Sequence, residues 1–331
     1  MKYRELGQSE LNVSTIAMGC WAIAGDAMWG PQDEQDAIEA IQTALDLGVN
    51  LFDTAEGYGI GESERLLARG LGARRDEALI ATKVSPSHLK QDQVVAACER
   101  SLQRLNTDRI DLYQIHWPNW DVPFDETMRA LESLRDAGKV RVIGVSNFGP
   151  RDMRDMLAAG RFESNQLAYN LLVRAIEHEI MPLCREHEVG VLCYSPIMQG
   201  LLAGKFAAPD EVPPERARSR LFRADRPMAK HGEPGCEAQV FEVIDTLRDV
   251  ARAYDHDPAD IALAWCLHQP GVTSVLAGAR DADQMRANAR AASIALEPET
   301  LKQLDEASAP VKTYLGSNPD MWQSGDKVRM R

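Results

Sequence analysis

The sequence predicts an α/β protein, a (β/α)8 TIM barrel with an N-terminal β-hairpin and a long loop after the seventh strand. Two observations lead to this prediction. Short apolar runs of strand length alternate with segments of helix length, and the alternation supplies eight strand candidates, the number that closes a parallel barrel. No unmatched block is left over for another unit, so we expect a single domain over residues 1–331.

The opening segment has a turn-like GQSE between two short extended runs, which indicates the hairpin. The barrel strands are then expected at TIAMG, NLFDT, ALIATK, DLYQIHW, VRVIGVSN, SNQLAYN, VGVLCYSP and VTSVLAG. Segments of helix length are expected at 33–48, 61–72, 91–105, 125–138, 150–160, 175–188 and 281–292. The longest departure from this rhythm, residues 198–235, is rich in Pro, Arg and Gly and is expected to be a functional loop. Residues 311–331 are expected to form a weakly structured C-terminal tail that folds over the barrel mouth.

Composition excludes several classes of protein. With 37 Lys and Arg against 50 Asp and Glu the net charge is -13, so the long-range field repels nucleic acid and any phosphate site must be local. The six cysteines contain no CxxC pair, which favours a reducing compartment. No run of 18 apolar residues occurs, and the opening MKYRELGQSELNVS is polar and mixed in charge, so we expect neither a membrane span nor a secretory signal. We expect a cytoplasmic protein with no membrane or nucleic-acid partner and leave its oligomeric state open.

Four residues stand at or just past the ends of successive strand candidates: Asp53, Tyr58, Lys83 and His116. Barrel folds keep their chemistry at these strand ends. Tyrosine normally titrates near 10, so a Tyr acid needs a nearby cation, which Lys83 could supply with Asp53 as its counter-charge. His116 could hydrogen-bond a carbonyl oxygen and orient it toward Tyr58. Each residue alone also suits a structural role, and the coincidence of all four is what indicates protonation of a carbonyl.

A protonated carbonyl still needs a hydride, which no side chain can donate, so an organic cofactor is implied. The segment GYGIGESE is not a dinucleotide fingerprint, because Glu62 and Glu64 occupy the third glycine positions. A metal-assisted hydrolase would need His and carboxylate ligands at several strand ends, and only His116 with Asp53 qualifies. His178, Cys184 and His187 lack an acidic or Cys partner nearby, so we expect no metal site.

The motifs FDTAEGYG, ALIATK, DLYQIHWP, GKVRVIGVSNF, NQLAYN and YSPIMQGLLAGK occur in the order seen in one family. The chain resembles an aldo-keto reductase, in particular the bacterial branch with broad-specificity and sugar or polyol dehydrogenase members. The resemblance implies NADP(H)-dependent interconversion of aldehydes or ketones and alcohols, with NAD(H) also possible. It implies Tyr58 as general acid and base, Lys83 and Asp53 tuning it, and His116 orienting the carbonyl.

The same resemblance implies a set of cofactor contacts at the nicotinamide, pyrophosphate and adenosine ends. They are Cys20, Trp21, Ser146, Asn147, Gln166, Tyr194, Ser195, Pro196, Ile197, Gln199, Gly200, Leu201, Lys205, Gly278, Arg280, Gln284 and Asn288. Arg280 is our candidate for the 2′-phosphate, and Arg216 or Arg218 of the long loop could share that task. The family pattern departs at Ala287, which stands where relatives have a Glu at the adenine end.

The substrate pocket is expected from Trp21, Tyr58, His116 and Trp117, with Trp29 and Trp120 as open candidates from the loops. Two other functions remain open. One is an NADP(H)-binding regulatory or redox-sensing subunit with little turnover, and the other is an NAD(P)-dependent sugar or polyol dehydrogenase working in the oxidative direction. The physiological carbonyl is not written in these motifs.

Overall fold

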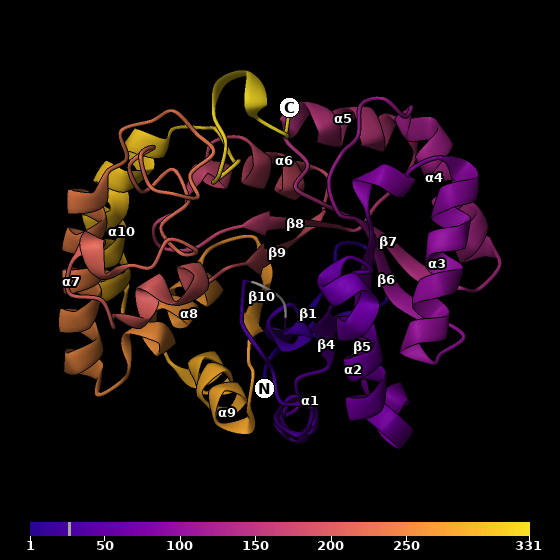
Figure 1. The fold of residues 1–331 in the computed structure, drawn as a ribbon, viewed down its shortest axis with the longest axis horizontal. Helices are drawn as coiled ribbons and strands as arrows, with labels where there is room; N and C mark the ends of the chain where they lie inside the picture. Colours follow the sequence, from indigo (N-terminus) through magenta and orange to yellow (C-terminus); the bar gives the residue numbers. More distant parts are fainter. Residues whose placement is uncertain (26–27) are drawn as a thin grey trace.

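A computed structural model describes residues 1–25 and 28–331 and confirms the predicted barrel (Figure 1). The parallel strands close in the order β10-β3-β4-β5-β6-β7-β8-β9. Their bounds are β3 Ile16–Gly19, β4 Leu51–Asp53, β5 Leu79–Val84, β6 Ile110–Ile115, β7 Val140–Ser146, β8 Ser164–Ala168, β9 Gly190–Tyr194 and β10 Val272–Gly278. The barrel closes where Val275 of β10 pairs with Ile16 of β3. Because all of these strands run parallel, their carboxyl ends open on one face.

Helices surround the strands. They are α1 Glu34–Asp46, α2 Glu62–Leu71, α3 Gln91–Leu105, α4 Phe124–Asp136, α5 Pro150–Ala159, α6 Ile180–Glu186, α7 Glu237–Tyr254, α8 Pro258–His268, α9 Ala282–Arg290 and α10 Pro298–Leu315. The helix expected over 175–188 is shorter, because Ala175–Glu177 forms a separate 3-10 turn before α6. Among the described residues, no helix has both the length and the apolar character needed to cross a bilayer.

Helices α7, α8 and α10 were not predicted. For α8 and α10 the reason lies in their own sequences. In α8 the residues from Asp260 to Leu267 are all buried, so the helix has no polar stripe to reveal its period. Pro310 lies inside α10, and a proline is normally a stop signal for a helix. We expected a weakly structured tail from residue 311 onward. This expectation is wrong for residues 311–315, because α10 continues to Leu315.

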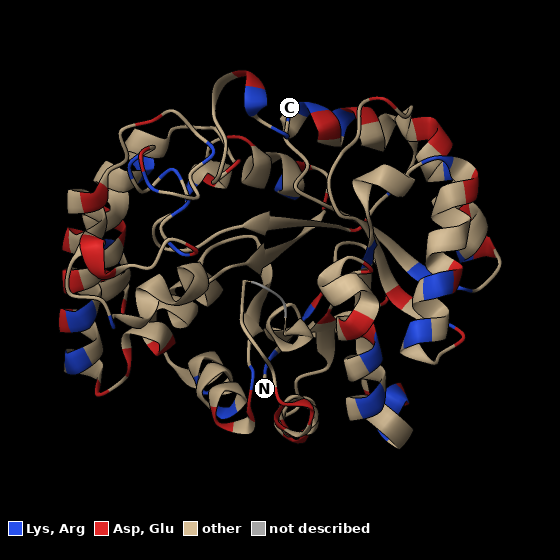
Figure 2. Cartoon of the chain, in the orientation of Figure 1, with Lys and Arg blue, Asp and Glu red and all other residues tan. Residues whose placement is uncertain are grey.

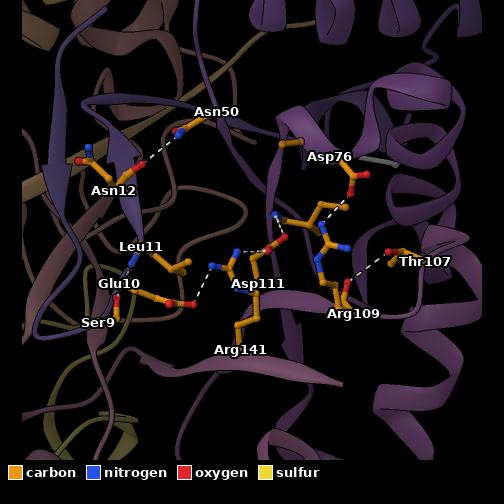
Figure 3. Close-up of polar contacts among 12 residues, drawn as sticks. Ser9, Glu10, Leu11, Asn12, Asn50, Asp76, Thr107, Arg109, Asp111 and Arg141 are labelled. Atoms are coloured by element: carbon orange, nitrogen blue, oxygen red, sulfur yellow. Dashed lines mark hydrogen bonds and ion pairs between the residues drawn. The ribbon is translucent and has the colours of Figure 1, made fainter. Parts of the chain in front are cut away.

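The N-terminal hairpin closes the barrel floor. Strands β1 Tyr3–Glu5 and β2 Asn12–Ser14 pair antiparallel, and the buried Leu6 and Leu11 join the cluster of side chains inside the barrel. Figure 3 shows the polar contacts at this end, where Arg141 donates to Glu10 at 2.8 Å and to the buried Asp111 at 2.8 Å. Chemistry is thus left to the opposite face, where the strands end.

The long loop and the tail meet over the mouth of the barrel. Arg220 of the loop is buried, pairs with Glu233 at 2.9 Å and donates to the carbonyl oxygens of Leu315 and Asn318 at 3.0 and 3.1 Å. The tail after α10 ends beside α5 (Figure 1), where the backbone oxygen of Arg331 accepts from the N–H groups of Arg151 and Asp152. The tail therefore crosses the mouth between two anchors.

Gly144 of β7 tests how tightly the interior is packed. A Cβ at this position would lie 2.5 Å from Ser164 Oγ and 3.0 Å from Gln114 Cγ. We predict that Gly144→Ala lowers the free energy of unfolding by about 1–3 kcal/mol through overpacking, measured by urea denaturation. Gly232→Ala, which meets no atom within 4 Å, should be nearly neutral, and equal effects of the two changes would contradict the argument.

Candidate active site

A cavity of about 850 Å³ opens at the carboxyl ends of the strands. Its wall begins with Asp53 at the end of β4 and reaches Gln284 and Asn288 of α9, so it runs from the barrel axis to the rim. Most of the predicted cofactor and substrate residues line it. They are Trp21, Tyr58, His116, Trp117, Ser146, Asn147, Gln166, Tyr194, Ser195, Pro196, Ile197, Gln199, Gly200, Lys205, Gly278, Arg280, Gln284 and Asn288.

The four strand-end residues come together at the floor of this cavity. The fully buried Lys83 ammonium lies 2.6 Å from Asp53 Oδ1 and 3.3 Å from Tyr58 Oη, and it also donates to the carbonyl oxygen of Thr54 at 2.8 Å. The Tyr58 ring meets the His116 ring edge-on, with centroids 5.6 Å apart. Asp53, Tyr58 and His116 face the cavity, whereas Lys83 stands behind them. The arrangement can hold a proton on Tyr58 beside a neutral imidazole.

Burial and charge set the protonation states of this group. Burial raises the pKa of Tyr58 above its usual 10, and the Lys83 cation opposes the rise without reversing it. Burial alone would lower the pKa of Lys83, but the attraction of Asp53 leaves that pKa above its ordinary value. Burial, assisted by the nearby Lys83 charge, lowers the pKa of His116 to about 3. At neutral pH the site therefore holds a protonated Tyr58, a cationic Lys83 and a neutral His116.

Asp53 uses its second oxygen to hold two amides. Gln166 Nε2 donates to Oδ2 at 2.6 Å and Gln114 Nε2 donates to the same atom at 3.2 Å. Gln114 was not predicted, although it lies in β6 two residues before His116, which directly follows the strand. Continuing the alternation of β6 by one residue would put both side chains on one face. The carboxylate is thus saturated with donors from β5, β6 and β8.

The predicted polar residues at the exits of β7 and β9 are linked to one another. Tyr194 Oη donates to Asn147 Oδ1 at 2.9 Å, and Asn147 Nδ2 donates to the carbonyl oxygen of His116 at 3.0 Å. Asn147 and Ser195 adopt φ angles of 62° and 52°. Residues other than glycine rarely adopt this left-handed backbone conformation, and those that do often lie at functional sites. Cys20 and Leu201 are buried and do not line the cavity.

Arg280 is held by the segment that precedes α1. Its guanidinium donates to Gln32 Oε1 at 2.7 Å and to the carbonyl oxygen of Trp29 at 2.9 Å, and it also contacts the carbonyl oxygen of Pro31. Gln32 returns a hydrogen bond to the carbonyl oxygen of Arg280 at 2.8 Å. The residue proposed for a phosphate therefore also fastens a loop beside the cavity.

Several lining residues lie outside the predicted site, except that Arg216 and Arg218 were open candidates for the 2′-phosphate. Trp322, Gln323 and Arg329 come from the tail, and Arg216, Arg218, Met228 and Lys230 come from the long loop. Of the two open tryptophan candidates, Trp29 lines the cavity, whereas Trp120 donates to Asp152 at 2.9 Å and is absent from the wall. No strand-end pattern marks these positions, because both segments are irregular.

The cavity wall is cationic on a chain of net charge -13. Among the described residues that line it, Asp53 is the one carboxylate, whereas the Lys and Arg lining residues are Lys205, Arg216, Arg218, Lys230, Arg280 and Arg329. Figure 2 shows the positive residues gathered on the long loop beside the barrel mouth. The wall therefore suits an elongated anionic ligand that reaches the rim from the floor, and polar amides and hydroxyls are present to orient it.

The buried ion pair between Lys83 and Asp53, at the bottom of the cavity, leads to a prediction about stability. Lys83→Met leaves the Asp53 carboxylate with amide donors but no cation, so we expect a loss of about 3 kcal/mol in the free energy of unfolding. The double change Asp53→Asn with Lys83→Met removes both charges and should recover more than half of that loss. Urea denaturation of the three proteins tests this, and a double variant less stable than Lys83→Met would refute it.

The sequence is similar to those of known proteins along most of its length. Residues 15–309 match the aldo/keto reductase family. The chain is 33% identical over 316 residues to the aldo-keto reductase YhdN of Bacillus subtilis, covering 92% of this chain and 93% of that one. It is also 33% identical over 324 residues to an NADH-specific methylglyoxal reductase of Escherichia coli, covering 89% and 95%.

Solved structures give the same result. The glycerol dehydrogenase of Gluconobacter oxydans superposes with a TM-score of 0.79 at 30% identity, covering 93% of this chain and 95% of that one. An aldo-keto reductase of Klebsiella pneumoniae in complex with NADPH superposes with a TM-score of 0.73 at 29% identity, covering 92% and 94%. The barrel, its cationic mouth and these likenesses have one explanation: the chain belongs to the aldo/keto reductase family.

Proposed function

We propose that the protein is an NADP(H)-dependent oxidoreductase that interconverts aldehydes or ketones and alcohols, with Tyr58 as its general acid and base. The observation that carries this proposal is the position of the Lys83 ammonium, 2.6 Å from Asp53 and 3.3 Å from Tyr58 at the floor of the cavity. Membership of the aldo/keto reductase family and a relative solved with NADPH support the choice of cofactor.

The bound cofactor would supply a hydride from its nicotinamide C4 to the carbonyl carbon. Tyr58 gives its phenolic proton to the carbonyl oxygen, so the carbonyl gains one hydride and one proton and leaves as an alcohol. Lys83 stabilises the phenolate that remains, because its charge lies within hydrogen-bond distance of Tyr58 Oη. The phenolate then recovers a proton from solvent. In the oxidative direction the same phenolate accepts the proton of the alcohol.

His116 orients the carbonyl rather than protonating it. Its pKa of about 3 leaves the imidazole neutral, so it offers one N–H to the substrate oxygen and carries no acid proton at pH 7. The edge-on contact between the rings of Tyr58 and His116 lets both groups address the same oxygen. Together they supply two donors where negative charge develops.

The remaining wall provides for the cofactor. Ser146, Asn147 and Gln166 would hold the nicotinamide carboxamide, and the Tyr194 ring would cover one face of the nicotinamide. The turn from Ser195 to Gly200, with Lys205 beside it, would bind the pyrophosphate. Gly278, Arg280, Gln284 and Asn288 would hold the adenosine end, close to the start of α9 where anions are favoured.

A single-turnover experiment tests the proposal. Protein loaded with NADPH is mixed with 4-nitrobenzaldehyde and then with a panel of aldehydes, ketones and sugars, while the absorbance of the reduced nicotinamide is followed. We expect oxidation of one equivalent of NADPH. Tight binding with no oxidation across the panel would instead support a cofactor-binding regulatory role.

Tyr58→Phe separates chemistry from binding. We predict that kcat falls by about 10²–10⁴-fold, because the proton donor is lost, while the Kd for NADPH changes by less than about threefold. Stopped-flow turnover and fluorescence titration measure the two quantities. Tyr3→Phe, on the hairpin at the opposite face, is the matched control. Normal turnover in Tyr58→Phe would remove Tyr58 from the mechanism.

Arg280 should determine preference between cofactors. Only NADPH carries a 2′-phosphate, and losing a charge-assisted hydrogen bond costs about 1.5–3 kcal/mol, so Arg280→Ala should raise the Kd for NADPH by about 10–100-fold. The Kd for NADH should rise far less. Gln32, in the segment before α1, accepts a hydrogen bond from Arg280. Gln32→Ala removes this partner but keeps the Arg280 charge, so it should change the Kd for NADPH and the Kd for NADH alike. Equal weakening of both cofactors by Arg280→Ala would place the phosphate elsewhere.

A further inference from the structure

We propose that the carbonyl substrate carries a carboxylate, and that Arg218 binds this group beneath the C-terminal tail. The inference rests on the proposed function and identifies the substrate class for the same site. It starts from a cation on the cavity wall for which the described part of the chain provides no counter-charge.

The Arg218 guanidinium differs from two other arginines of the wall, Arg280 and Arg329. Arg329 is paired with the buried Asp320 through two contacts of 2.8 Å, and Arg280 donates to the loop that precedes α1. Within residues 1–25 and 28–331, Arg218 has neither an ion pair nor a hydrogen bond, and its Nε is fully buried without an acceptor. A half-buried cation in this state is costly unless a ligand supplies the anion.

The surroundings of Arg218 increase this need. Burial lowers its pKa, and the neighbouring charges of Arg216 and Arg329 lower it further. Its guanidinium lies 5.6 Å from the centre of the Trp322 ring and lines the same cavity as Tyr58 and His116. An anion placed here would offset the unfavourable effect of these two charges on Arg218, which favours a negatively charged ligand over a neutral one.

Arg218 lies beside the tail residue Trp322, and Trp322 adjoins Trp117 of the expected substrate pocket. Trp322 lies parallel to Tyr194, with centroids 6.2 Å apart, and lies 6.3 Å from Trp117, the residue that follows His116. Arg218 contacts this group through the Trp322 ring. Two other cations are available for the cofactor phosphates, Lys205 beside the Gly200 turn and Arg280 at the start of α9. Arg218 was also a sequence-based candidate for the 2′-phosphate, and we now assign it to the substrate instead. The anion bound by Arg218 is therefore expected on the substrate.

The chemistry of these groups defines the class of substrate. A guanidinium presents parallel N–H donors that match the two oxygens of a carboxylate. Trp21, Trp117 and Trp322 supply flat apolar walls between this cation and Tyr58. The site suits an aldehyde or ketone with a planar or apolar body and a carboxylate at its far end.

Two matched aldehydes test the proposal: 4-carboxybenzaldehyde and its neutral methyl ester, methyl 4-formylbenzoate. We expect the wild-type protein to show the higher kcat/KM with the acid, and this preference to fall as salt is added. Arg218→Met should lower kcat/KM for the acid at least about tenfold more than for the ester, mainly through KM. Arg218→Lys keeps the charge without the paired donors and should give an intermediate loss.

Arg223→Met is the matched control, because Arg223 lies on the same loop, is exposed and does not line the cavity. It should retain the wild-type preference. Binding is measured separately by calorimetry with the alcohol product 4-(hydroxymethyl)benzoate in the presence of NADPH, a pair that cannot react with each other, so the measurement gives a result even when no aldehyde is turned over. Far-UV circular dichroism confirms that each variant is folded.

The outcomes distinguish the two proposals. No preference for the acid in the wild type, or equal losses for acid and ester in Arg218→Met, overturns the carboxylate site. A large rise in the Kd for NADPH in Arg218→Met would instead assign Arg218 to the cofactor and also overturn it. If neither aldehyde oxidises NADPH while calorimetry shows binding that depends on Arg218, the proposed reaction fails and the anion site stands.

Discussion

The ion pair between Lys83 and Asp53 is the interaction on which the mouth of the barrel depends. A fully buried ammonium is tolerable only because Asp53 lies 2.6 Å away and the Thr54 carbonyl and Tyr58 hydroxyl accept its other protons. Asp53 in turn binds Gln114 and Gln166, so four barrel strands, β4, β5, β6 and β8, converge on one carboxylate. A one-residue slip in any of these strands would turn its side chain to the other face and break the group.

Stability and chemistry occupy opposite ends of the barrel. The hairpin fills the floor with leucine side chains and anchors Glu10 to Arg141, while the strand ends at the mouth carry the polar cluster. Charge is divided in a similar way, since the chain is acidic overall and the cavity wall is cationic. An anionic ligand is therefore attracted by a local field rather than by the net charge of the protein.

The barrel and its strand-end cluster could be predicted from the sequence because both follow short-range rules. Alternation of apolar runs located the strands, and the convergence of parallel strand ends brought Asp53, Tyr58, Lys83 and His116 together. Gln114 could have been found by the same rule, because it lies at the end of β6 two residues before His116.

The contributions of the tail and the long loop could not be predicted in this way. Trp322 reaches Tyr194 across more than a hundred residues of chain, and no periodic pattern records such a contact. Helix α8 shows no alternation of polar and apolar residues with helical period, because its residues from Asp260 to Leu267 are all buried. In α10, Pro310 suggested that the helix ends before its last turn. Cys20 and Leu201 adjoin lining residues in the sequence, but their side chains are buried away from the cavity.

The tail lines the cavity but lies outside the barrel strands. Its two anchors, Arg220 at one end and the first turn of α5 at the other, hold main-chain atoms, whereas Trp322 and Arg329 between them face the cavity. Substitutions between the anchors can therefore change the substrate wall while the barrel and the proton-transfer group keep their geometry. During evolution the tail could therefore change in sequence while the barrel stays the same, so that relatives with the same strand-end residues come to accept different carbonyl compounds.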